Sequence, residues 1–139
     1  MSPRDDATLC ARVIRVAVDA TRDPYVVRET WRVARGARDA RELVTRIVRH
    51  VLAVPYQPDG PGSDPIQSVA ETLRGVPCDC EDRAAAVLAM LAVCGLDGGA
   101  VYVAVEGAPV DHMASCARVG GRYVWADATP PGIIGGTVT

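Results

Sequence analysis

The stretch Gly75-Val76-Pro77-Cys78-Asp79-Cys80-Glu81-Asp82-Arg83-Ala84-Ala85 leads into a run of Ala, Val, Leu and Met that continues as far as Cys94-Gly95. The length and apolarity of this run predict a buried helix that Cys80 opens and that Gly95 ends from the C′ position. The sequence therefore predicts a cysteine thiol in the first turn of a central helix.

This position makes Cys80 a candidate nucleophile. The N-terminus of a helix carries about half a positive charge, which stabilises a thiolate placed there. The carboxylates of Glu81 and Asp82 act against it, since negative charge nearby disfavours a second negative charge. Activation of Cys80 then has to rely on an imidazolium partner, as in Cys-His ion pairs. Cys78 is a second thiol beside the site, and the sequence leaves open whether Asp82 bonds Arg83 or a substrate amide.

A β-hairpin is predicted further along the chain. Gly120-Gly121 separates two runs of alternating apolar and polar residues, which favours a two-residue turn. Pairing Val119 with Arg122 and counting outward sets Cys116 against Trp125, and directly opposed residues share a face of the sheet.

The same register brings a histidine and an aspartate together. Ala114 is then opposite Asp127, and His112 lies two residues beyond Ala114, so it points to the same face as Asp127 as a diagonal neighbour. A one-residue change in the turn would turn one strand over and separate them. Cys80, His112 and Asp127 therefore form a candidate thiol triad.

In this order, the three residues resemble the transglutaminase-like cysteine enzyme superfamily, which has a papain-like thiol triad. The family's core has a Cys followed two residues later by Asp at the start of an apolar helix, then a His, and then an Asp preceded by Trp. The Cys80-Glu81-Asp82 form is similar to that of small phage- and prophage-encoded members, and the resemblance covers about residues 39–131. The chain departs from the pattern with Cys78-Asp79 in place of Gly-Asp, and with Ala128-Thr129 where Pro is common.

The resemblance implies that Cys80 is the nucleophile, His112 the base and Asp127 the residue that orients the imidazole. The reaction would be acyl transfer from an amide through a thioester, in a peptidase, an amidase or a transglutaminase, with a protein or peptide substrate and no cofactor. The Cys80 backbone N–H would form part of an oxyanion hole. Further candidates for that hole or for substrate binding are Gln67, Tyr56 and Trp125.

Each of these residues also has an interpretation without catalysis. A Cys at a helix start can be a small buried residue, and His112 can be a satisfied core histidine. Asp127 can instead cap a turn into Thr129, since Asp bonds its own backbone in turns. His50, the other histidine, falls on an apolar helix and is expected to be structural.

A metal site would use the same sulfur and nitrogen atoms. Cys-x-Cys at Cys78 and Cys80 is tighter than the usual zinc knuckle, and no second pair with ligand spacing follows. Cys94 lies at the far end of the predicted helix, about 21 Å from Cys80. We therefore expect no metal ion.

Composition indicates an ordinary globular protein: 139 residues, 49% hydrophobic and 23% charged. Five cysteines, several of them in apolar runs, favour reduced thiols and a cytoplasmic location. The beginning of the chain is too polar for a signal peptide, and no run is long enough to span a membrane. We expect one domain over residues 1–139, with a helical lead-in at 1–54, a catalytic core at 64–131 and a frayed tail at 132–139.

Charge is uneven along the chain. Residues 1–50 carry 11 Arg and 7 acidic residues, a net +4, and residues 51–139 carry 4 Arg and 10 acidic residues, a net −6, which together give the overall −2. Acidic residues are interspersed among the arginines, so a solvated helix face is favoured over a nucleic-acid site. The alternative function is a non-enzymatic phage or prophage structural or accessory module that keeps the fold.

The overall order of elements predicts an α+β domain with the central helix packed on an antiparallel sheet. Capping signals start a helix at Asp23-Pro24 and another at Asp39. A loop is predicted at residues 55–63. The expected helices cover residues 7–21, 24–35, 39–52, 64–73 and 80–94, and the expected strands cover residues 100–106, 112–119 and 122–128.

Overall fold

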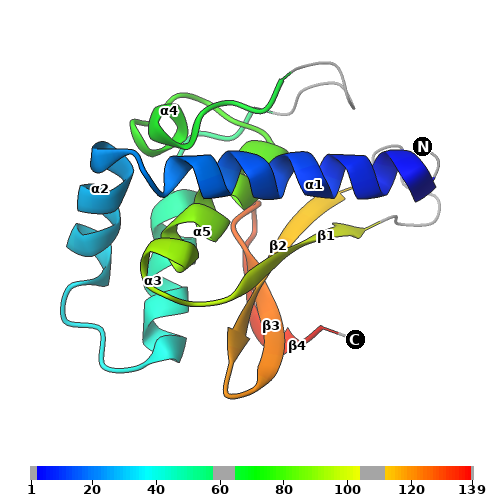
Figure 1. The fold of residues 1–139 in the computed structure, drawn as a ribbon. Helices are drawn as coiled ribbons and strands as arrows, with labels where there is room; N and C mark the ends of the chain where they lie inside the picture. The colour runs from blue at the N-terminus through cyan, green and yellow to red at the C-terminus, as the bar shows by residue number, and fades with distance from the viewer. Residues whose placement is uncertain (1–2, 58–64, 104–111, 139) are drawn as a thin grey trace.

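The computed structural model describes residues 3–57, 65–103 and 112–138, and there the chain forms five helices followed by four strands (Figure 1). This α+β architecture confirms the predicted fold class. The helices are α1 Pro3–Ala20, α2 Pro24–Ala34, α3 Ala40–Leu52, α4 Val69–Leu73 and α5 Cys80–Val93. The strands are β1 Gly98–Val103, β2 His112–Val119, β3 Arg122–Asp127 and β4 Ile133–Thr137.

Side chains at the predicted positions cap α2 and α3. The Asp23 carboxylate accepts the backbone N–H of Tyr25, and the Asp39 carboxylate accepts that of Glu42 at 2.8 Å. These bonds satisfy N–H groups that have no partner within the helix. Both helices begin where the sequence predicts, whereas α1 begins at Pro3, four residues earlier than expected.

Helix α5 begins with a capping box and ends at a glycine. The Asp79 carboxylate accepts the N–H groups of Glu81 and Asp82, and the Asp82 carboxylate accepts the N–H of Asp79 in return. At the other end Gly95 has a φ of +76°, a conformation that glycine adopts without strain, and its N–H donates to the Ala92 carbonyl. The predicted bounds of the central helix are therefore confirmed.

The strands form a single antiparallel sheet in the order β1-β2-β3-β4. Gly120 and Gly121 both have positive φ values, as the predicted two-residue turn requires. Val119 pairs with Arg122 and Cys116 with Trp125, so the register predicted from the sequence is confirmed over this part of the hairpin.

Besides α1, three segments differ from the sequence predictions, and the first is β1, which begins at Gly98 instead of residue 100. Residues 133–137, expected in a frayed tail, form the edge strand β4, which pairs with β3. Helix α4 begins only at Val69, because the Ser68 side chain caps it and the Gln67 N–H is already bonded to Asp82. Residues 58–63 of the predicted loop, Asp64 of the predicted helix start and residues 104–106 of the first predicted strand lie outside the described residues.

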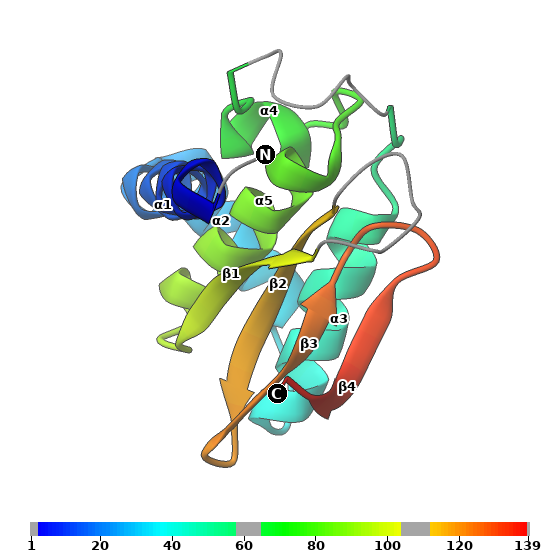
Figure 2. The ribbon, with the colours of Figure 1, turned by 90° about the vertical axis from the view of Figure 1, so that its right-hand side faces the viewer.

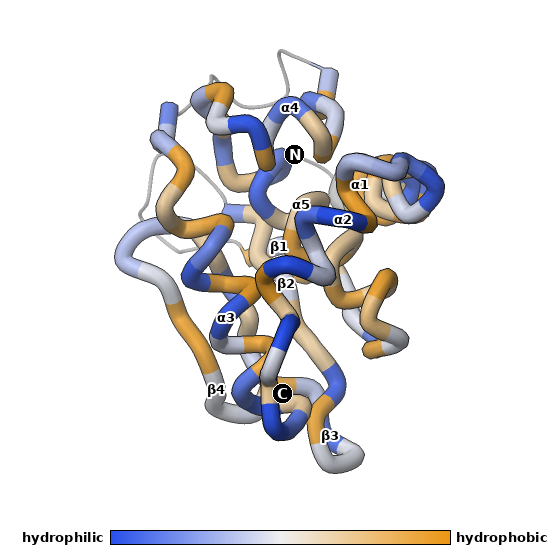
Figure 3. The backbone as a smooth tube through the Cα atoms, turned by 90° about the vertical axis from the view of Figure 1, so that its left-hand side faces the viewer, coloured by the Kyte–Doolittle hydropathy of each residue, from blue (hydrophilic) through white to orange (hydrophobic). Residues whose placement is uncertain are grey.

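The helices cover one face of the sheet, with α5 at the centre of the layer (Figure 2). Ten consecutive residues of α5, from Asp82 to Leu91, are buried, whereas α3 alternates between hydrophilic and hydrophobic segments because only one side of it faces the core (Figure 3). Met113, Ala117 and Ala126 contribute the sheet's share of the core. Among the described residues, no helix combines the length and apolarity needed to cross a membrane.

Candidate active site

The three residues of the predicted triad meet at one end of the sheet. Cys80 is the first residue of α5, His112 the first residue of β2 and Asp127 the last residue of β3. The start of α5, the start of β2 and the end of β3 lie at the same end of the molecule in Figure 2. Elements far apart in the sequence therefore bring a thiol, an imidazole and a carboxylate together.

The imidazole of His112 is held by the carboxylate of Asp127. His112 Nε2 lies 2.7 Å from Asp127 Oδ2, and Asp127 is buried with 6% of its surface exposed. The other oxygen, Oδ1, accepts the backbone N–H of Thr129 at 3.1 Å. Asp127 therefore contacts the histidine through one oxygen atom and caps a turn through the other.

The thiol of Cys80 lies beside His112 and interacts with its ring. The hydrogen bond that the ring donates to the Asp127 carboxylate, followed by its interaction with Cys80, raises the pKa of His112 from its ordinary value of 6.5 to about 10, against the opposing effect of burial. At neutral pH the ring is an imidazolium, the partner that an activated cysteine requires.

Cys78 differs from Cys80 in its environment. Its side chain is buried with 2% of the surface exposed, and its Sγ lies 3.9 Å from the carbonyl oxygen of Pro55. Burial raises the pKa of the Cys78 thiol to about 11, so it stays protonated at neutral pH. These properties favour Cys80 over Cys78 as the reactive thiol.

Asp82 and Gln67 form a structural contact beside the site. The Asp82 carboxylate accepts the backbone N–H of Gln67 at 2.7 Å and that of Asp79 at 3.1 Å, and burial raises the pKa of Asp82 to about 6. The side-chain amide of Gln67 donates to Thr72 Oγ1 and to the Val76 carbonyl. Because its amide N–H groups are engaged there, Gln67 would have to give up one of these bonds to donate to an oxyanion.

The ring of Tyr56, another candidate for the oxyanion hole, lies 5.3 Å from the guanidinium carbon of Arg83. Burial raises the pKa of its hydroxyl, and the neighbouring Cys80 and Asp79 raise it further, against the lowering effect of Arg83, so the hydroxyl remains a hydrogen-bond donor at neutral pH. A backbone bridge to Cys78 fixes Tyr56 beside the start of α5. Trp125 is half-buried on β3, two residues before Asp127, and forms no hydrogen bond through its side chain in the described part of the chain.

The burial of Arg83 beside the site was not predicted from the sequence. Its side chain is fully buried, with 1% of its surface exposed, and the guanidinium donates to the carbonyl oxygens of Val51, Val54 and Ala128. It thereby joins α5 to the end of α3 and to the residue after Asp127. In the sequence, the only indication of this role is an arginine at the start of an otherwise apolar run.

The remaining candidates lie elsewhere. His50 Nε2 is 3.2 Å from Glu29 Oε1, which pairs α3 with α2, and burial lowers the pKa of this histidine. All five cysteines lie in the described segments, and no disulfide joins any two of them. Over residues 3–57, 65–103 and 112–138, no group of three or more His, Cys, Asp or Glu side chains is arranged to hold a metal ion.

Comparison with known proteins gives a likeness in fold. The sequence matches no protein-family model and no curated protein. The structure is similar to the crystal structure of "a Putative Cysteine Protease from Cytophaga hutchinsonii", with a TM-score of 0.64 and 16% sequence identity. The match covers 94% of this chain and 43% of the other, so this chain spans less than half of that protein's length. At this identity the likeness shows a shared fold.

Proposed function

We propose that the protein is a cysteine-dependent acyl-transfer enzyme that acts on amide bonds through Cys80, His112 and Asp127. The observation that carries the proposal is the continuous chain of contacts from the Cys80 thiol to the His112 ring and on to the Asp127 carboxylate. The transglutaminase-like pattern of the sequence, including its phage-type form, and the fold shared with the Cytophaga hutchinsonii structure support it.

In the first step, the Cys80 thiolate attacks the carbonyl carbon of the amide and a carbon–sulfur bond forms. The imidazolium of His112 then gives its proton to the leaving amine as the carbon–nitrogen bond breaks, which leaves a thioester and a neutral imidazole. In the second step, His112 takes a proton from water or from an amine, whose oxygen or nitrogen displaces the sulfur. Asp127 holds the ring throughout and stabilises its charged form.

The first turn of α5 offers a backbone N–H group to the oxyanion. The carboxylate of Asp79 accepts the N–H groups of Glu81 and Asp82, and the Asp79 carbonyl accepts that of Arg83. The N–H of Cys80 has no partner among the described residues, so it remains available to the oxygen of a tetrahedral intermediate. The hydroxyl of Tyr56 is the second donor in this proposal, and the substrate is a protein or peptide.

The test compares the reactivity of the five cysteines. A free thiol is only a few per cent ionised at pH 7, so we expect iodoacetamide to label Cys80 at least about tenfold faster than each other cysteine. Mass spectrometry of labelled peptides measures each rate. The substitution His112→Ala should remove this advantage, and the matched substitution His50→Gln should leave it unchanged.

Two results would contradict the proposal. Fastest labelling at Cys78 would move the nucleophile to that residue. Similar slow labelling of all five thiols would instead support a non-enzymatic module with the same fold. If Cys80 leads, then release of amine from short peptide amides, with and without added primary amines, separates hydrolysis from amine transfer.

A further inference from the structure

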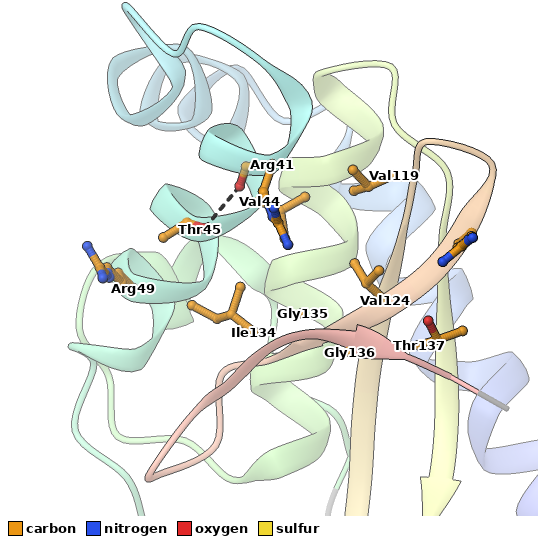
Figure 4. Close-up of a pocket in the computed structure, with 11 residues that line it drawn as sticks. Arg41, Val44, Thr45, Arg49, Val119, Val124, Ile134, Gly135, Gly136 and Thr137 are labelled. Atoms are coloured by element: carbon orange, nitrogen blue, oxygen red, sulfur yellow. Dashed lines mark hydrogen bonds between the residues drawn. The ribbon is translucent and has the colours of Figure 1, made fainter.

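A cavity of about 570 Å³ opens between α3 and the strands β3 and β4 (Figure 4). Its lining includes Arg122 at the start of β3, whereas Asp127 stands at the end of that strand, about 17 Å away at the usual rise per residue. Cys80, His112 and Asp127 do not line it. This cavity is therefore separate from the candidate active site.

The floor of the cavity is aliphatic. Val119 and Arg122 are directly opposed in the hairpin, and Val124 follows two residues later on the same face of β3. Ile134 of β4 is 38% exposed, a large value for an isoleucine beside a core helix. In Figure 4 the side chains of Val44, Val119, Val124 and Ile134 lie between α3 and the strands. The lining holds no aromatic ring, so it offers no stacking surface to a nucleobase.

Three arginines line the same cavity: Arg41 and Arg49 on α3, and Arg122 on β3. None of the three forms an ion pair or side-chain hydrogen bond with any residue that the structure describes, and the lining contains no carboxylate. By contrast, Arg38 and Arg46 on or beside the same helix both pair with Glu42. The cavity therefore combines an apolar floor with positive charge that is not neutralised.

The position of Arg41 in its helix is electrostatically unfavourable. Arg41 occupies the first turn of α3, where the helix macrodipole is positive and a cation is unfavourable. Arg49, in the last turn, is favourable for the helix. The helix dipole therefore favours an arginine at position 49 but not at position 41. A role for Arg41 has to lie in contacts outside the helix.

We propose that this cavity binds an anionic amphiphile, namely an unbranched aliphatic chain that ends in a carboxylate or phosphate group. The chain packs on the four aliphatic side chains, and the anionic group accepts hydrogen bonds from Arg41 and Arg122, whose planar guanidinium groups suit both carboxylate and phosphate. The volume lies within the range of ordinary small-molecule sites, about 300–1,000 Å³. The proposal does not depend on catalysis by Cys80.

The experiment is a methyl NMR titration of the full chain at pH 7.5 with decanoate, decyl phosphate and decanol, each below its micelle concentration. We expect saturable shifts of the methyl signals of Val44, Val124 and Ile134 with the two anions, and binding of decanol about tenfold weaker. Tighter binding of decanoate points to a free fatty acid as the natural ligand, and tighter binding of decyl phosphate points to a phospholipid-derived one. Either order supports the proposal.

The double variant Arg41→Gln/Arg122→Gln should weaken binding of both anions about tenfold while leaving decanol unchanged. The matched control is Arg118→Gln, an exposed arginine on the opposite face of the same hairpin, which should bind like the natural chain. Absence of saturable shifts, shifts that lie outside the cavity, or equal affinity for decanol and the anions would overturn the proposal.

Discussion

The charge of the His112 ring is the property on which the candidate site depends. The hydrogen bond that the ring donates to Asp127 and its interaction with Cys80 raise the pKa of His112 to about 10. We therefore expect the ring to stay protonated from pH 6 to beyond pH 8, and we expect the substitution Asp127→Asn to bring its pKa down towards 6.5. The ring C–H signals in a pH titration by NMR measure both values.

His50 serves as the internal control in that titration, because the chain has two histidines and burial lowers the pKa of this one. Its signal should titrate below pH 6.5 in both proteins. Titration of the His112 signal below pH 7 in the natural chain would show that the ring is not an imidazolium under working conditions, and the mechanism would then lack its proton source.

At the scale of single residues, the sequence identifies the contact between His112 and Asp127 because two glycines fix the hairpin register. It does not identify the role of Arg83. The three carbonyl oxygens that bind this guanidinium lie 32, 29 and 45 residues away along the chain. No local pattern or propensity reports contacts of that range, so the burial of Arg83 becomes visible only in the folded structure.

At the scale of elements, the approach of β1 to α5 depends on the absence of a side chain at Gly98. A Cβ atom at this position would lie 2.7 Å from a methyl group of Leu88, 3.0 Å from the Cys116 carbonyl oxygen and 3.1 Å from a methyl group of Leu91. We expect Gly98→Ala to lower the free energy of unfolding by about 1–3 kcal/mol, because the strand must move away from the helix. Urea denaturation measures the change.

The neighbouring Gly99 provides a matched control. A Cβ atom there would meet only the Cys116 sulfur at 3.3 Å, and alanine restricts the unfolded chain more than glycine does. We expect Gly99→Ala to change stability by less than about 1 kcal/mol in either direction. If the two variants proved equally stable, close packing at Gly98 would not limit the approach of β1 to α5.

The sequence predicts elements best where their ends carry a local signal. Asp23, Asp39 and Gly95 mark the helix ends found in the structure, because capping bonds form within a few residues. Strand β4 carries no such signal: its Gly135 and Gly136 have positive φ values and its pairing partner is β3. Pairing with a neighbouring strand, rather than the propensity of its own residues, orders this segment.

At the scale of the whole molecule, Arg83 connects three parts of the fold through one buried guanidinium. The substitution Arg83→Met would leave the carbonyl oxygens of Val51, Val54 and Ala128 without this donor. We expect a loss of at least about 2 kcal/mol in the free energy of unfolding, because buried acceptors without partners cost about 1–3 kcal/mol each, offset in part by removal of a buried charge. Urea denaturation measures it.

The matched control is Arg15→Met on α1, which removes an exposed arginine and should change stability by less than about 0.5 kcal/mol. A conservative variant, Arg83→Lys, keeps the charge but has no planar fork, so we expect it to recover only part of the loss. Equal stability of Arg83→Met and the natural chain would mean that the three segments hold together without this side chain.

The raised pKa of His112 also makes stability depend on pH. Its value is about 10 in the folded chain and 6.5 as the ordinary value, so the folded state binds the proton more tightly. The resulting stability is fully present below pH 6.5 and is lost as the pH rises towards 10. Between pH 7 and 8.5 few other groups interfere, since burial raises the pKa of Asp82 to about 6 and that of the Cys78 thiol to about 11.

In that window we expect the free energy of unfolding of the natural chain to fall as the pH rises, with a slope no greater than about 1.4 kcal/mol per pH unit, the limit for one proton. In Asp127→Asn the slope should be much smaller, because the carboxylate that stabilises the imidazolium is gone. Urea denaturation at intervals of half a pH unit gives both slopes. Parallel slopes would mean that Asp127 does not hold the proton on His112, even if the two side chains remain in contact.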